Sequence, residues 1–241
     1  MIRNLGWSLA LILCARTAGA QATWEILDNS FLVEESFNQE RGVFQNIFTW
    51  TQVRPGDWQA NITQEWPAPS VRHQLSYTIP FSREHGDGGL DQILLNYRYQ
   101  LVQETPTRPA MSPRASVVLP TGREPDFRGH RPWGMEFNLP ASKQFGDIYV
   151  HANAGVRWIR DVDTRGFVAA SGIWRTTPLF NLMLEAVGEL GDGLTLSPGF
   201  RRAWDIGERQ VVVGLAAPVT RSRGVSQVAV LSYFSYELPF R

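Results

Sequence analysis

The stretch "DIYVHANAGVRWIRD" (Asp147–Asp161) alternates between apolar and polar residues, which is typical of a β-strand with two different faces. The apolar residues would share one face: Ile148, Val150, Ala152, Ala154, Val156 and Trp158. The opposite face would carry Tyr149, His151, Asn153, Gly155 and Arg157. In a soluble sheet the apolar face would cover a protein core. In a transmembrane barrel it would face lipid, and the polar face would line the lumen.

The same alternation recurs along the chain from about residue 42 onward, and turn residues rich in Gly, Pro and Asp separate the segments. An even number of strands would return both ends of a bacterial barrel to one side. We therefore predict an all-β fold, an antiparallel transmembrane β-barrel of about 12 strands preceded by a signal peptide. The predicted strands are 42–53, 58–66, 71–81, 90–102, 113–120, 134–145, 148–159, 165–175, 179–189, 194–204, 209–218 and 226–240.

The beginning of the chain predicts export. Residues 1–20 combine Arg3, an apolar run and the small residues "AGA", which is the pattern of a cleaved secretory signal. Residues 21–41 would form a periplasmic or lumenal segment, and residues 42–241 the outer-membrane barrel. The single cysteine, Cys14, lies in the predicted signal, so the exported chain would have no disulfide or thiol chemistry.

The charge balance argues against nucleic acid as a partner. Of the 23 basic residues, Arg3 and Arg16 would leave with the signal, so 21 would face 23 acidic residues. A nucleic-acid-binding chain normally carries a basic excess. We expect outer-membrane lipid and a small-molecule cargo as partners instead, and a location in the outer membrane.

Aromatic residues near the predicted strand ends suggest two membrane-interface girdles. They are Trp50, Trp58, Trp66, Trp133, Trp158, Trp174, Trp204 and Tyr236. Charged residues of both signs fall in mid-strand, where a wet lumen would solvate them and a soluble core would not. The outer face of a soluble sandwich would accept them equally well, but would need a second layer of strands. The predicted pore-lining residues are Glu65, Arg98, Glu136, Arg157, Glu185, Glu189 and Arg201.

The acidic stretch Thr23–Arg41 allows two interpretations. It is either a periplasmic tether or a plug that folds into the lumen, as occurs in some barrels. In a plug, Glu34, Glu35 and Glu40 would meet arginines of the lumen.

Two resemblances support the barrel. The final stretch "VAVLSYFSYELPF" resembles the closing strand of Gram-negative outer-membrane proteins, which implies recognition by the barrel assembly machinery through a strand ending in Phe240. The stretches "DNSFLVEESFNQERGVFQNIF" (28–48), "QLSYTIPFS" (74–82), "DQILLNYRYQL" (91–101) and "ASVVLPTG" (115–122) resemble a family of outer-membrane transporters associated with the meta pathway of phenol degradation. This second resemblance implies the fold more strongly than the cargo.

Enzymatic motifs are sparse. The four histidines are His73, His85, His130 and His151, and no GxSxG, HExxH or calcium-loop pattern occurs. We therefore expect no catalytic residues, no metal and no cofactor. A barrel enzyme acting on lipids would need a serine and a histidine in contact, and a structural or adhesive barrel would need a filled lumen.

The favoured interpretation is a narrow channel for passive uptake of small molecules, with aromatic or hydrophobic compounds among the candidates. Opposed arginines and glutamates would set its selectivity. Two features fit the predicted strands poorly: Pro140 inside a segment and the long connection 103–112, where a tight turn is expected.

Overall fold

The structure is a computed structural model, and it describes residues 26, 30–122, 131–207 and 209–240. The predicted signal peptide and His130 lie outside the described residues. Within the described residues, no helix is long and apolar enough to cross a membrane.

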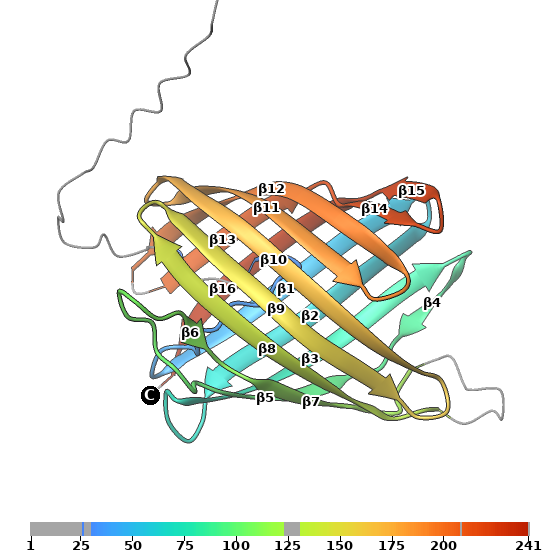
Figure 1. The fold of residues 1–241 in the computed structure, drawn as a ribbon, viewed down its shortest axis with the longest axis horizontal. Helices are drawn as coiled ribbons and strands as arrows, with labels where there is room; N and C mark the ends of the chain where they lie inside the picture. The colour runs from blue at the N-terminus through green and yellow to red at the C-terminus, as the bar shows by residue number, and fades with distance from the viewer. Residues whose placement is uncertain (1–25, 27–29, 123–130, 208, 241) are drawn as a thin grey trace, which may run out of the picture.

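The fold is a closed antiparallel barrel of 12 strands (Figure 1). The ring strands are β1 (Val43–Arg54), β2 (Asp57–Pro67), β3 (His73–Glu84), β5 (Leu94–Tyr99), β7 (Arg114–Val118), β8 (Gly134–Phe145), β9 (Ile148–Ile159), β10 (Asp163–Thr177), β11 (Phe180–Glu189), β12 (Gly193–Ile206), β13 (Arg209–Ala216) and β16 (Val230–Pro239). Each pairs with its neighbours in this order, and β1 pairs with β16 to close the ring. Four short strands extend it: β4 (Asp87–Leu90), β6 (Ala110–Met111), β14 (Val219–Ser222) and β15 (Val225–Val228).

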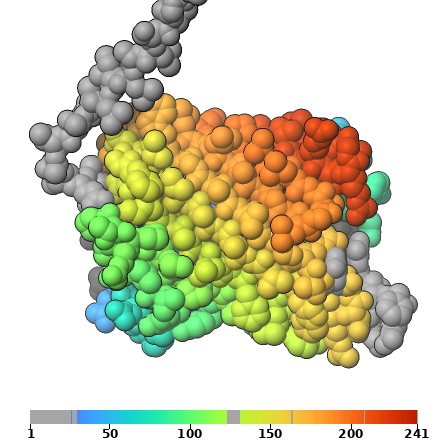
Figure 2. All heavy atoms as spheres, viewed as in Figure 1, coloured from blue at the N-terminus to red at the C-terminus, as the bar shows by residue number. Residues whose placement is uncertain are grey.

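The barrel is apolar outside and polar inside, which answers the question raised by the β9 sequence. Along Ile148–Ile159 the side chains alternate, with Val150 and Val156 exposed and His151 and Asn153 buried. The same arrangement holds elsewhere, because Leu184 and Phe200 are exposed whereas Glu185 and Arg201 are buried. Figure 2 shows one outer face, where side chains of the strands from β8 to β12 lie side by side. The predicted fold class is therefore confirmed.

Val43, the first residue of β1, lies opposite Pro239, the last residue of β16. We call this end of the barrel the terminal end. The turns between β1 and β2, between β3 and β4, and between β14 and β15 lie at the other end, on the right in Figure 1, which we call the open end. Trp50 and Trp58 stack at 4.4 Å near the open end, and Trp66 lies near the terminal end, 5.8 Å from Phe44.

The two sequence features that fitted poorly have local explanations. β8 continues through Pro140. Proline has no amide hydrogen to donate to a neighbouring strand, but the strand beside β8 is interrupted at this point, between β6 and β7. The Pro140 carbonyl accepts a bond from the Ser112 amide at this interruption. The long connection is itself a small hairpin, held by the bridges Val102↔Met111 and Thr105↔Arg108. The connection is long because it forms this hairpin, and the strand order is unaffected.

Candidate functional site

Residues 30–42 run through the barrel lumen as an irregular segment, which we call the plug. The plug makes no strand pairing with the wall. Its buried backbone groups still need hydrogen-bond partners, and polar side chains of the wall supply them. This explains why the lumenal faces of the strands are rich in Ser, Asn, Gln and Glu.

The backbone of the first half of the plug is bound by β9 and β11. The carboxylate of Glu185 accepts bonds from the amides of Leu32 (2.7 Å) and Val33 (3.1 Å). The side-chain amide of Asn153 accepts from the Glu34 amide (2.8 Å) and donates to the Glu34 carbonyl (2.7 Å). One side chain therefore satisfies both backbone groups of one plug residue.

The second half of the plug is bound by several different strands. The Ser36 amide donates to Ser142 Oγ (2.9 Å), and Ser112 Oγ donates to the Ser36 carbonyl (2.7 Å). The Gln39 amide donates to Gln74 Oε1 at 2.7 Å. Ser142 lies on β8, Gln74 on β3, and Ser112 between β6 and β7, so the plug is attached around much of the lumen wall.

Arg98 is the largest buried group that holds the plug, with only 2 % of its surface exposed. Its guanidinium donates to the carbonyls of Glu35 (3.0 Å) and Phe37 and to Asn38 Oδ1 (3.1 Å). A buried guanidinium requires several acceptors in a fixed geometry, and the turns of the plug provide them.

Glu34 connects the plug to the wall by charge. Its Oε1 lies 3.3 Å from Arg98, and its Oε2 accepts from Arg114 Nε and Asn138 Nδ2, both at 2.8 Å. Burial alone would raise the pKa of Glu34, but Arg114 and Arg98 outweigh it, so the pKa lies below the ordinary 4.5. The ionised carboxylate is therefore the form that holds the plug.

Phe31 is the main apolar anchor of the plug. Its ring lies 4.9 Å from that of Tyr233 and packs over Gly214, where an added Cβ would come within 2.2 Å of the ring. The surrounding apolar cluster includes Ile47, Met183 and Leu231. Gly214 thus leaves a recess in the wall that the Phe31 ring fills.

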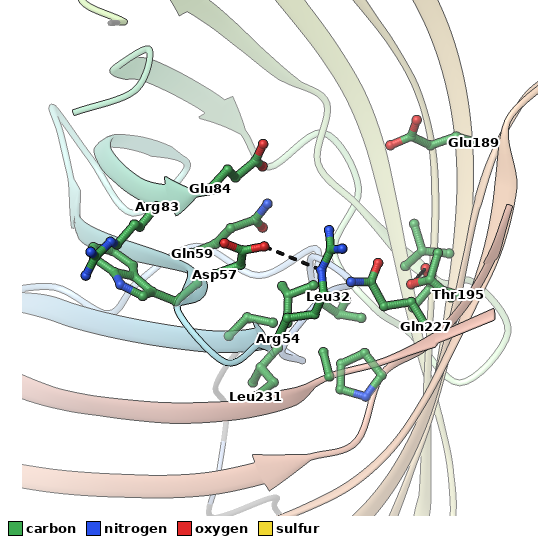
Figure 3. A pocket seen from close by; sticks show the side chains of 17 residues that line it. Leu32, Arg54, Asp57, Gln59, Arg83, Glu84, Glu189, Thr195, Gln227 and Leu231 are labelled. Carbon is green, nitrogen blue, oxygen red and sulfur yellow. Dashed lines mark hydrogen bonds and ion pairs between the residues drawn. The ribbon is translucent and has the colours of Figure 1, made fainter. Parts of the chain in front are cut away.

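A cavity of about 490 Å³ occupies the open end of the lumen (Figure 3). Its lining includes Leu32 of the plug and a ring of polar side chains from strands on both sides. These side chains include Arg54, Asp57, Gln59, Arg83, Glu84, Glu189, Thr195 and Gln227. Because Leu32 belongs to the plug, the plug borders this cavity directly.

Two further cavities lie along the wall. One, of about 350 Å³, is lined by Glu34, Arg114 and polar residues of β1, β2 and β3. It adjoins the cavity at the open end. Thr51 and Gln59 line that cavity, and Thr49 and Asn61, which line this one, are the next inward-facing residues along β1 and β2. The other, of about 330 Å³, lies between Glu136, Arg157 and Glu189.

The seven predicted pore-lining residues fall into three groups. Arg98 and Glu185 contact the plug, and Arg201 donates to the carbonyl of Ile26, which precedes the plug, at 3.4 Å. Glu136 pairs with Arg114 at 2.7 Å, and Glu65 accepts a bond from Gln74 at 2.7 Å. Arg157 and Glu189 line the cavities toward the open end. The plug occupies the lumen into which these residues point, and their role in lining a pore stays a prediction.

The sequence interpretation missed Arg114, Asn138 and Asn153 as functional candidates. Arg114 stands at the first position of its strand, and both asparagines are uncharged, so a search for mid-strand charges passes over them. The alternation of the strands could have identified the two asparagines, because residues two apart share a face. Asn153 lies on the same face as His151, and Asn138 on the same face as Glu136.

One pair in the lumen has the composition of a hydrolase site. Ser142 Oγ and His151 Nδ1 are hydrogen-bonded at 2.7 Å, the contact that a barrel enzyme would need. Ser142 and His151 are, however, only 1 % and 2 % exposed, and Ser142 Oγ already accepts the Ser36 amide. In this arrangement the pair orients a bond to the plug, and the hydroxyl is buried beneath it.

The geometry defines a plugged transmembrane-type barrel. The fold is similar to the crystal structure of the COG4313 outer membrane channel from Pseudomonas putida F1, with a TM-score of 0.65 and 10 % sequence identity over 84 % of this chain and 98 % of that chain. No family model and no curated protein matches the sequence. The resemblance to the phenol-degradation transporter family therefore stays a prediction.

Proposed function

We propose that this protein is an outer-membrane channel for passive uptake of small molecules, and that the plug is its gate. The terminal end would face the periplasm and the open end the exterior. The observation that carries the proposal is the way the lumen is closed. Cavities reach inward from the open end to the plug, and side-chain contacts, with no strand pairing, hold the plug to the wall. Such contacts break without opening the barrel.

The cargo belongs to the same proposal. Small solutes, aromatic or hydrophobic ones among them, would enter the polar cavity at the open end and pass when the plug withdraws. Arg157 and Glu189, which line the cavities there, are candidates for setting ion selectivity. The structure of the Pseudomonas putida channel supports the fold on which this function rests.

A disulfide between plug and wall tests the gate. Ser30 Oγ and Ser171 Oγ lie 2.8 Å apart, so S30C/S171C places two thiols in contact. A refolded chain without residues 1–20 has no other cysteine, which makes the pairing unambiguous. In planar bilayers the oxidised variant should be silent, and a reductant should restore discrete conductance steps.

The single variant S30C is the matched control, since it carries one thiol in the same place and should conduct in both redox states. Equal conductance of oxidised and reduced S30C/S171C would show that solutes bypass the plug. A reduced variant without conductance, in a correctly folded barrel, would contradict the channel itself.

We also infer that the Ser142–His151 pair is not a hydrolase site. A fluorophosphonate probe should leave Ser142 unlabelled in the folded barrel, because the plug covers the hydroxyl. Labelling of wild type that is lost in S142A would favour the enzyme instead.

A further inference from the structure

Two arginines of the wall face each other directly. Arg98 and Arg114 are register partners on β5 and β7, and Arg114 is the partner of Asn138 on β8. Like charges directly opposite each other on neighbouring strands repel, so this pair needs an anion between them. Glu136 of the wall binds one edge of Arg114. The anion that bridges Arg114 to Arg98 comes from the plug, as the carboxylate of Glu34.

The three donors are arranged as a carboxylate site. One oxygen of Glu34 receives Arg98, and the other receives both Arg114 and Asn138. Charge-assisted bonds of this kind recognise a carboxylate wherever it comes from. Glu34 occupies the site only because the plug brings it there, so withdrawal of the plug leaves a cationic site on the wall.

Solutes in the lumen have access to this site. The Glu34 side chain is 19 % exposed and that of Arg114 is 15 % exposed. Both line the 350 Å³ cavity, which adjoins the larger cavity at the open end. A small solute that enters from the open end therefore reaches the ion pair before it reaches the terminal end.

We propose that Arg98, Arg114 and Asn138 bind the carboxylate of a small solute, which takes the place of the Glu34 carboxylate and frees the plug. This rests on the proposed channel function and assigns its cargo to small carboxylates. The exchange conserves charge, since one carboxylate leaves as another arrives, and an anion stays between Arg98 and Arg114. A neutral solute of the same shape cannot make this exchange.

The variant E34A empties the site without altering the wall. Calorimetric titration of the refolded E34A chain with benzoate should detect binding, and the neutral isostere benzamide should not bind. Wild type should bind benzoate about tenfold or more weakly, because its own Glu34 competes for the charged donors.

Two further variants separate this site from a loosened plug. E34A/R114Q removes a donor and should lose benzoate binding. S30A removes the Ser30–Ser171 contact but keeps Glu34 in place, so it should bind benzoate no better than wild type. Equal binding by E34A and E34A/R114Q, or equal binding of benzoate and benzamide, would overturn the proposal.

Conductance provides the second readout. At constant ionic strength benzoate should raise the open fraction of wild type, which is the fraction of time that the channel spends in its conducting state. Benzamide should leave this fraction unchanged. Barrels that are silent in every variant, with selective benzoate binding by E34A, would refute the channel and support the site. Conducting barrels with no benzoate response and no binding by E34A would refute the site and leave the channel.

Discussion

The wall and the plug are stabilised by different parts of the chain. Main-chain ladders close the wall from β1 around to β16, so the wall depends little on any one side chain. The plug depends on individual side chains, such as Asn153 for Glu34 and Glu185 for Leu32. A substitution in the lumen should therefore change the position of the plug before it changes the stability of the barrel.

Removal of the plug is the most severe test of this difference. Deletion of residues 21–41 should give a barrel that still folds and stays open, because the ladder is complete without the plug. Conductance should become continuous, and the heat-sensitive electrophoretic mobility typical of folded barrels should remain. An unfolded product would show that the plug is part of the core that the wall requires.

A bulky residue in the wall should expel the plug without deleting it. G214V places side-chain atoms in the recess that the Phe31 ring fills, and such overpacking costs about 1–3 kcal/mol. The open fraction should rise by roughly tenfold or more. G188V is the control with the same substitution, since an added Cβ at Gly188 would meet neighbours only at ordinary contact distances of 3.8 Å or more. Equal effects of both variants would contradict a specific role for the recess.

Acid should weaken the attachment of the plug through Glu34. Its pKa lies below 4.5 in the plugged state, so the carboxylate stabilises that state above its ordinary pKa, and the stabilisation is lost as the pH falls through the lowered value. The open fraction of wild type should therefore rise as the pH falls below 4.5, the ordinary pKa of the group. Arg98, Arg114 and Glu136 face this carboxylate.

The variant E34Q isolates this contribution, because it keeps the shape of the side chain and cannot titrate. Its open fraction should be higher than that of wild type at neutral pH and should rise less on acidification. Identical pH profiles of wild type and E34Q would assign the response to another group.

Ion pairs at the rim of the open end should matter least. Arg165 lies 3.6 Å from Glu189, but these side chains are 56 % and 51 % exposed. Exposed pairs contribute roughly 0–1 kcal/mol. R165A should therefore leave the thermal unfolding midpoint and the open fraction nearly unchanged. A marked rise in the open fraction would show that ion pairs at the rim also hold the plug in place.

The sequence predicted the wall well because period-two alternation is a local property. The predicted boundaries of the strands at 134–145 and 148–159 agree with β8 and β9. The order within the connection 103–112 was not predicted, because it comes from tertiary contacts such as the bond from Lys143 to Glu104 at 2.8 Å. Alternation in the strand sequences cannot show such contacts.

The plug was predictable only as one of two alternatives. Residues 30–42 have no periodicity of their own, and their conformation depends on partners far away in sequence, such as Glu185 for Leu32. The arginine pair shows the same limit. Arg98 and Arg114 become opposed only through the β5–β7 register, which depends on how the intervening hairpin folds.

The turn at Gly42 has a consequence for barrel assembly. A slip of two residues between β1 and β16 would keep every apolar side chain outside, so hydrophobicity alone does not reject it. In the native register the Phe240 amide donates to the Gly42 carbonyl at 2.6 Å, and a Cβ on Gly42 would lie 2.9 Å from the Phe240 carbonyl oxygen. Only glycine fits this position, where φ is +78° and the chain turns from the plug into the first strand. The turn at Gly42 therefore fixes the register between β1 and β16, the first and last strands of the barrel.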